Sequence, residues 1–250
     1  MYIPKHFDEQ DQAVIDALIE ANPLATLITH GSSGVNSSLS SHLNANHIPL
    51  HVIRRLNEHG VITRYLEGHV AKANAIVQEL RENNSLLAIF VGVQRYISPS
   101  LYASKKVDGK VVPTWNYEAV HIYGSVRLIE DEVGLMGILK SLTLSQEHSL
   151  AHPWAVDDAP ADYTQKLMGA IVGFEISIER VLAKRKLSQN QPVHNQASII
   201  AGLSTSAQLA GSLQTTSGAI DNQMVQAVAG ASASANAIAI ARAAAGVEKP

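Results

Sequence analysis

Two long stretches of this chain alternate apolar and polar side chains, and they constrain its fold more than any other feature. Residues 119–129 place Val120, Ile122 and Val126 on one side, and residues 171–182 repeat the pattern. A period of two is that of a strand with one buried face. Shorter strand-like runs occur at residues 24–29, 48–52, 61–65 and 86–97. The six or seven strands are broken by helices at irregular places, which predicts an antiparallel barrel with peripheral helices and not a doubly wound sheet.

Helices are predicted between these strands over residues 8–22, 68–82, 131–147 and 160–169. Asp8 or Asp11 can cap the first helix. Its buried face is predicted to hold Val14, Ala17, Leu18 and Ala21. The Asp-Gly pair at 108–109, between residues 105–107 and 110–112, predicts a β-hairpin. The serine-rich residues 35–44 are not assigned.

A change in composition marks the end of the folded module. Every aromatic residue lies between Tyr2 and Phe174, whereas residues 204–250 hold 14 alanines and four charges. We therefore predict one domain over residues 1–203 and an Ala/Ser-rich tail over 204–250. High alanine content favours a helix over about 221–245, which would dock on a partner subunit. The small polar residues favour a weakly ordered segment instead, so partial order is expected.

Composition also excludes several classes of protein. The absence of cysteine rules out disulfides, thiolate metal sites and a thiol nucleophile. No apolar signal region opens the chain and no run is long enough to span a bilayer, so a cytoplasmic protein without membrane attachment is expected. A net charge of −3 gives no overall footprint for nucleic acid. The common nucleotide, metalloprotease and hydrolase motifs are absent, and neither a metal site nor a catalytic residue is assigned.

The segment Gly-His-Val-Ala-Lys-Ala-Asn at residues 68–74 is the first candidate site. It follows a strand and is predicted to open a helix, where free backbone N–H groups can meet an anion. His69 and Lys72 add charge there, which suits a phosphate group. The alternative is an ordinary solvated helix face.

Two further segments concentrate polar and aromatic groups. Residues 96–102 and 112–117 combine hydroxyls, an amide and large aromatic rings, which suit a planar ligand or a subunit interface, or a core with buried tyrosines. Residues 183–190 follow a strand with three consecutive cations, which could meet phosphate or be solvated. Gln189 there can bind the edge of a heterocycle through its amide.

Six segments in the expected order give the chain a resemblance to a known family. They are residues 1–7, 68–74, 96–100, 112–117, 153–163 and 186–190. Together they resemble the PaiB family, described as FMN-binding negative transcriptional regulators. That family has a split β-barrel related to pyridoxamine-phosphate oxidases and flavin reductases. The resemblance covers about residues 1–203, and Arg185 departs from it where the family tends to carry an aromatic residue.

The resemblance implies a mainly β, α+β split barrel that forms a homodimer with FMN in a groove between subunits. It implies that His69, Lys72 and Asn74 bind the phosphate and that the strand at Asn46, His47 and Ile48 flanks the ring with main-chain groups. Trp115 and Tyr117 would lie at the dimer interface, over the flavin ring, and so would also bind the cofactor. The full set of implied cofactor-binding residues adds Ser98, Ser100 and Gln189.

The implied function is negative regulation of transcription, with targets such as degradative enzymes and sporulation genes. No helix-turn-helix is legible, so direct DNA contact has no support from charge or motif. An FMN-dependent oxidoreductase with indirect regulatory effects is the alternative. A structural dimer without flavin is the third hypothesis.

Overall fold

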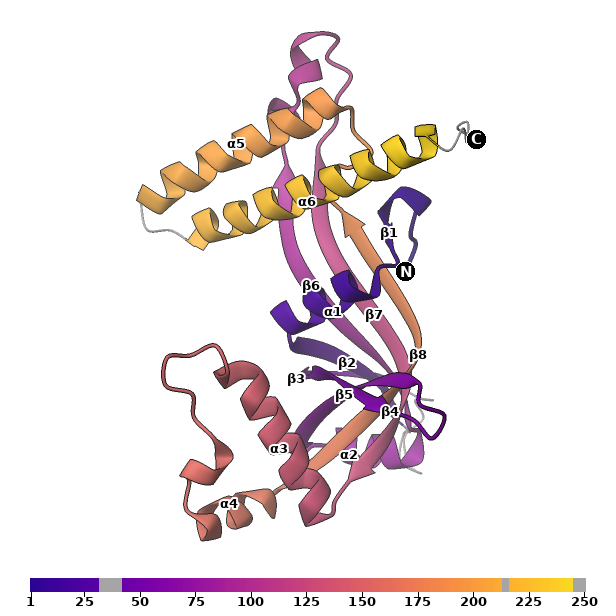
Figure 1. The fold of residues 1–250 in the computed structure, drawn as a ribbon, viewed down its shortest axis with the longest axis vertical. Coiled ribbons are helices and arrows are strands. Elements are labelled where there is room, and N and C mark those ends of the chain that lie inside the picture. Colours follow the sequence, from indigo (N-terminus) through magenta and orange to yellow (C-terminus); the bar gives the residue numbers. More distant parts are fainter. Residues whose placement is uncertain (32–41, 213–215, 245–250) are drawn as a thin grey trace. The chain divides into compact units, whose positions relative to one another are not determined.

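One curled antiparallel sheet dominates the structure, a computed structural model that describes residues 1–31, 42–212 and 216–244 (Figure 1). Its strands are β1 (Asp8–Glu9), β2 (Leu24–Gly31), β3 (His42–Pro49), β4 (His51–Leu56), β5 (Ile62–Ala71), β6 (Ser85–Ile97), β7 (Thr114–Ile129) and β8 (Ile171–Lys186). The order is β3-β2-β6-β7-β8-β5-β4, with β1 paired to β8. The end strands β3 and β4 follow each other around Leu50, so the sheet curls back without closing. The predicted mainly β, α+β split-barrel class is confirmed.

Helices occupy the predicted gaps and the carboxyl-terminal part of the chain. They are α1 (Gln12–Ala21), α2 (Ile76–Glu82), α3 (Glu132–Glu147), α4 (Ala161–Met168), α5 (Val193–Ser212) and α6 (Thr216–Ala244). The predictions of α3 and α4 are confirmed within a few residues. None of the described helices combines the length and the apolar character needed to cross a bilayer.

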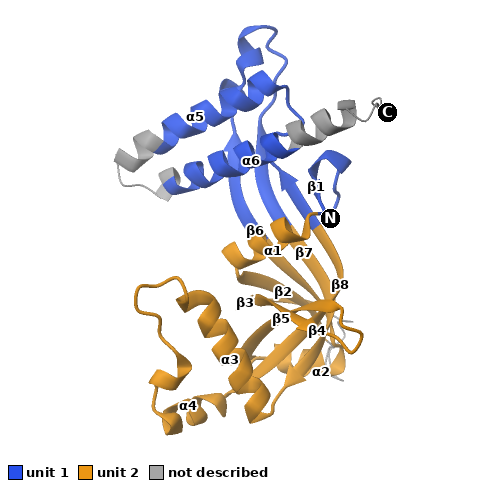
Figure 2. Cartoon of the chain, in the orientation of Figure 1, with its two compact units in different colours: residues 1–10, 91–119, 183–250 blue, residues 11–90, 120–182 orange. Residues whose placement is uncertain are grey.

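The chain divides into two compact units, coloured separately in Figure 2. Unit 1 comprises residues 1–10, 91–119 and 183–250, and unit 2 comprises residues 11–90 and 120–182. Strands β6, β7 and β8 contribute residues to both units. Each unit buries apolar side chains of its own.

In unit 1 the core lies beneath the two carboxyl-terminal helices. Ile199 and Leu203 of α5 and Met224 and Val228 of α6 join a buried cluster with Leu187 and its neighbours. The helices lie side by side in Figure 1. The expected boundary after residue 203 falls inside α5, and the four-residue spacing of Met224 and Val228 places both on the buried face of α6. Residues 213–215 and 245–250 of the predicted tail lie outside the described residues.

The first helix buries a different face from the one predicted. Its N-cap is Asp11, one of the two predicted capping residues. The Asp11 carboxylate accepts a hydrogen bond from the Ala13 backbone N–H at 2.9 Å. The buried residues, however, are Ile15, Asp16 and Ile19. Asp16 tolerates burial because two arginines of β4 and β5 pair with its carboxylate, and this pairing fixes which face turns inward.

The predicted helix over residues 68–82 is wrong in its first half. Residues up to Ala71 continue β5, in register with β8, and α2 begins at Ile76. A Cβ atom on Gly68 would lie only 2.6 Å from Leu50 Cδ2, so glycine allows this close packing of the strand. Pairing with β8 therefore outweighs the local helical spacing.

The predicted hairpin around residues 108–109 is correct only in its turn. Gly109 has a φ of +69°, which favours glycine. The residues before it form the 3₁₀-helix η3 (Ala103–Lys106), and no strand is assigned from 107 to 113. The unassigned serine-rich stretch lies mostly outside the described residues.

Candidate functional site

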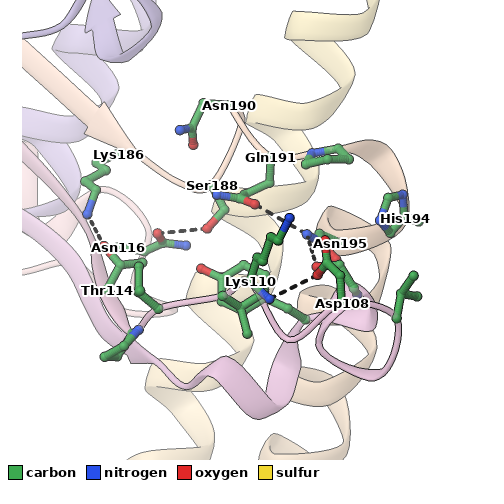
Figure 3. A pocket seen from close by; sticks show the side chains of 17 residues that line it. Asp108, Lys110, Thr114, Asn116, Lys186, Ser188, Asn190, Gln191, His194 and Asn195 are labelled. Atoms are coloured by element: carbon green, nitrogen blue, oxygen red, sulfur yellow. Dashed lines mark hydrogen bonds between the residues drawn. The ribbon is translucent and has the colours of Figure 1, made fainter.

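A cleft of about 660 Å³ opens in unit 1 where four segments converge (Figure 3). They are the connection between β6 and β7, the start of β7, the end of β8 and the start of α5. The volume lies within the range of about 300–1,000 Å³ typical of small-molecule sites. Its polar lining includes Ser104, Asp108, Lys110, Thr114, Asn116, Lys186, Ser188, Asn190, Gln191, His194 and Asn195.

Asn116 and Ser188 form the floor of this cleft. The Ser188 hydroxyl donates to Asn116 Oδ1 at 3.0 Å, and both side chains are buried. Asn116 Nδ2 has no hydrogen-bond partner among the described residues. Ser188 also has a φ of +64°, a left-handed conformation that is costly for a residue with a Cβ. A buried donor without an acceptor and a strained backbone therefore lie together here.

Lys186 brings a cation to the same place. Its ammonium donates to Thr114 Oγ1 and, at 2.9 Å, to the Trp115 carbonyl. Burial, and to a lesser degree the charge of Lys184, lowers the pKa of Lys186 from its ordinary value of 10.5. The lysine therefore loses its proton at a lower pH than a free lysine.

The buried side chain of Asn195 in α5 joins two of the segments that line the cleft. Its Oδ1 accepts from the Ser104 backbone N–H at 3.0 Å, and its Nδ2 donates to Ser104 Oγ at 3.0 Å. This reciprocal pair ties η3 to α5. The cleft is thus held in shape by buried amides.

None of the five predicted cofactor residues in unit 1 lines this cleft. Trp115 packs edge-to-face with Tyr96 at 6.1 Å, and Lys184 Nζ lies 5.1 Å from the ring centre of Tyr117. Ser98 caps the 3₁₀-helix η2 (Pro99–Leu101) and bonds Ser100. Gln189 Oε1 accepts from the Leu187 backbone N–H at 2.7 Å.

The residues that do line it are the immediate neighbours of predicted ones. Thr114 and Asn116 flank Trp115, and Ser188 and Asn190 flank Gln189. Side chains alternate along a strand, so Asn116 faces the opposite side from Trp115. Extending the period of two upstream from residue 119 is the sequence signal that would have found Asn116.

The other six predicted residues belong to unit 2. Asn46, His47 and Ile48 lie in the end strand β3, His69 lies in β5, and Lys72 and Asn74 lie in the turn before α2.

Two of these six residues meet directly. Asn74 Nδ2 donates to Asn46 Oδ1 at 3.2 Å, while Asn74 Oδ1 accepts from the Ile76 backbone N–H. The exposed Lys72 donates to the Gly169 carbonyl at 2.8 Å. The turn and the edge of the sheet are therefore joined by an amide pair. The sequence predicted that His69 and Lys72 lie on the first turn of a helix. That prediction is wrong, because the helix begins only at Ile76.

His69 lines a second cleft of about 360 Å³ with Pro49, Leu50 and Trp154. Its Nδ1 is buried without a partner among the described residues. Burial lowers the pKa of His69 below its ordinary value, which favours the neutral form of the ring. Two of the six resembling segments, 68–74 and 153–163, meet at this cleft.

Sequence reasoning missed a charged cluster in unit 2. Arg55 pairs with the buried carboxylates of both Glu67 and Glu175, and Arg127 donates to Glu175 at 3.2 Å. Burial raises the pKa of Glu67, and Arg55 opposes that rise. These residues come from separate strands, so their proximity follows from the register of β4, β5 and β8. No three His, Asp or Glu side chains in the described part of the chain are arranged to hold a metal ion.

Comparison with known proteins places these features in a family. Residues 1–180 match the family model described as "Putative FMN-binding domain". A curated, uncharacterized protein of Emericella nidulans is 31% identical over 229 residues, covering 81% of this chain and 90% of that protein. The protease synthase and sporulation protein PAI 2 of Bacillus subtilis is 29% identical over 194 residues, covering 76% of this chain and 83% of that protein.

Among solved structures, the FAD and heme binding protein of Mycobacterium smegmatis has a similar fold. The TM-score is 0.51 at 17% identity, with 78% of this chain and 80% of that chain covered. At this level of identity the likeness concerns the fold alone.

Proposed function

Because this chain belongs to the FMN-binding domain family, we propose that it is an FMN-binding regulatory protein that acts as a homodimer. FMN is the cofactor that family membership assigns to the chain. When bound, FMN supplies a carrier for one or two electrons. The match over residues 1–180 carries the proposal, since it includes all six proposed cofactor residues of unit 2.

The groups gathered in unit 2 fit the chemical needs of FMN. Its phosphate needs cations and N–H donors, which the exposed Lys72 ammonium and the Asn74 amide offer. Its ring needs donors and acceptors along one edge. An end strand such as β3, with Asn46, His47 and Ile48, leaves every second pair of main-chain groups available. His69, with an unpartnered Nδ1 among the described residues, can complete this set.

Exposed aromatic rings of unit 1 support the proposed homodimer. Trp115 is 53% exposed and Tyr96 is 46% exposed, although the two rings pack against each other. Aromatic residues are enriched in the centres of protein interfaces. We place Trp115 and Tyr117 at the dimer contact and retain Ser98, Ser100 and Gln189 in the proposed cofactor set.

The regulatory part of the proposal is supported by the likeness to the Bacillus subtilis protein, whose name refers to protease synthesis and sporulation. A net charge of −3 does not favour binding to the phosphates of DNA. Regulation through a flavin-dependent partner is therefore proposed in place of direct binding to DNA. A cytoplasmic location accords with such a role.

Flavin binding is tested by the absorbance and fluorescence of the purified protein during titration with FMN. Lys72→Ala is expected to weaken FMN about tenfold by removing one charge-assisted contact. Lys166→Ala, at an exposed lysine of α4, is the matched control and should leave the affinity unchanged. Absence of any FMN binding by the wild-type chain would overturn the cofactor role.

The class of function is tested separately on the FMN-loaded protein. Steady consumption of NADH or NADPH would replace the regulator with an FMN-dependent oxidoreductase. Changed expression of protease genes after deletion of the gene, without such consumption, is the result expected of a regulator. A mobility shift of promoter DNA that weakens with salt would show direct contact.

A further inference from the structure

We propose that the cleft of unit 1 is a second binding site, separate from the flavin site, for a small organic anion. The carboxylate or phosphate group of this ligand would be held between Asn116 Nδ2 and the Lys186 ammonium. Its short apolar body would lie against the valines of the connection between β6 and β7. These are Val107, Val111 and Val112.

The first step of the argument is the unsatisfied donor. Asn116 is 0% exposed and lines the cleft, yet its Nδ2 has no acceptor among the described residues. The Ser188 hydroxyl donates to Asn116 Oδ1, which leaves Nδ2 as the unpaired end of the amide. A buried donor without an acceptor destabilises the fold, because it has lost its hydrogen bonds to water without replacing them. An oxygen atom of a bound ligand would remove that destabilisation.

The second step is charge. An ammonium has three N–H donors, and Lys186 uses two of them on Thr114 Oγ1 and the Trp115 carbonyl. Both contacts are with neutral groups, so the positive charge is not balanced by them. The cleft also carries Lys110 and Asp108, so its charged lining has an excess of one cation at neutral pH. This favours an anionic ligand.

The third step is the backbone of Ser188, whose φ is +64°. Strained conformations of this kind cluster at ligand sites, where the surrounding structure holds them. Here the hydrogen bond to Asn116 holds the strained residue and the free amide in one arrangement. The site is thus built before a ligand arrives.

The chemistry of this cleft differs from that of the flavin site. Segments 112–117 and 186–190 belong to the family resemblance, yet none of the proposed cofactor residues lines this cleft. Among its described lining residues Tyr102 is the one Phe, Tyr or Trp, and the side chains of Trp115 and Tyr117 do not line it. These side chains do not form a flat slot of the kind that the three-ring system of a flavin needs. A cation, an amide and a wall of valines suit a smaller ligand.

The test is isothermal titration calorimetry, in which the FMN-loaded protein is titrated with butyrate and, separately, with inorganic phosphate. We expect one-to-one binding with a millimolar dissociation constant for at least one of them, and the better ligand identifies the head group. Asn116→Asp keeps an oxygen for Ser188 but replaces the donor with a negative charge, so it should weaken binding tenfold or more. Lys186→Gln should also weaken it about tenfold and serves if the first variant does not fold. Lys166→Gln is the control and should bind as the wild type does.

Three results would each overturn the proposal. They are the absence of binding for both anions, unchanged affinity in both cleft variants, and one-for-one displacement of butyrate by FMN, which would make the cleft part of the flavin site. If the protein does not bind FMN at all, the same titrations on the unloaded protein still decide this proposal. Failure of the flavin site and failure of the anion site are therefore distinguishable.

Discussion

Arg95 and Asp221 form an ion pair that anchors α6 to β6 within unit 1. Arg95 Nε lies 2.6 Å from Asp221 Oδ1, and Arg95 Nη2 donates to Asp221 Oδ2 at 3.2 Å. Asp221 is 1% exposed, although it belongs to an alanine-rich segment with only four charges. Burial of such a carboxylate requires a partner cation. The helix is therefore positioned by charge as well as by its apolar face.

The two halves of this pair are expected to respond unequally to substitution. Arg95→Met leaves Asp221 buried without its partner and should lower the free energy of unfolding by about 3–5 kcal/mol. Asp221→Asn should cost less, because the side chain of Arg95 is 34% exposed and can turn towards water. The double variant Arg95→Met with Asp221→Leu should recover most of the loss. Urea unfolding measures all three, and strictly additive losses would contradict the coupling.

Arg55 should contribute more to the free energy of unfolding at neutral pH than in acid. Arg55→Met leaves the buried carboxylate of Glu67 without its arginine, while Glu175 keeps Arg127, so we expect a loss of about 3–5 kcal/mol at pH 7. Burial already raises the pKa of Glu67, and removing Arg55 raises it further. A group with a raised pKa stabilises the fold below its unfolded value of 4.5 and loses that contribution as pH rises through the folded value.

The loss caused by Arg55→Met should therefore shrink when unfolding is measured near pH 5. Arg54→Met is the matched control, because Arg64 remains paired with Asp16 at 2.5 Å after Arg54 is removed. It should cost less than Arg55→Met at pH 7. Equal losses from Arg55→Met at both pH values would contradict the burial of charged carboxylates.

The sequence predicts features that depend on the local spacing of apolar residues, such as which face of a strand is buried. It does not predict contacts that depend on how distant strands and helices pair. Alternation identified the buried side of β7 at Val120, Ile122 and Val126, because each strand residue reports its own face. In α1 the same logic failed, because the partners of Asp16 lie on β4 and β5, far along the chain. A helical pattern shows which faces of a helix could be buried. Ion pairs with residues far along the chain decide which of these faces is buried.

The candidate sites show the same limit. The segments at 112–117 and 186–190 were recognised, but the side chains that meet in the cleft are Asn116 and Ser188, 72 positions apart. Their contact depends on the end of β8 reaching the start of β7, which no local pattern encodes. The left-handed conformation of Ser188 is equally invisible, since serine has no preference for it.

Acid should weaken unit 2 through its buried and half-buried histidines. Burial lowers the pKa of His51, His69 and His121 below the ordinary 6.5. A lowered pKa means that the stability is fully present above 6.5 and is lost as pH falls from there through the folded value. Each tenfold difference in proton affinity between folded and unfolded chain is worth about 1.4 kcal/mol.

Chemical unfolding at pH 7.5, 6.5 and 5.5 measures this effect, and stability should fall across the series. His69→Gln should flatten the dependence, because glutamine does not titrate. His6→Gln, at an exposed histidine of unit 1, should leave the slope unchanged. A slope that His69→Gln does not alter would assign the effect to other groups.

The strain at Ser188 gives a reversal in the usual ranking of alanine and glycine. Both Ser188→Ala and Ser188→Gly lose the hydrogen bond to Asn116. Only glycine accepts a φ of +64° without cost, so Ser188→Gly should be the more stable variant by about 1 kcal/mol. Ser104, in the 3₁₀-helix η3 on the other side of the cleft, is the control. There glycine should be less stable than alanine by about 0.5–1 kcal/mol, because it loses more conformational freedom on folding. Thermal unfolding of the four variants measures both differences, and the same ranking at the two serines would show that Ser188 is not strained.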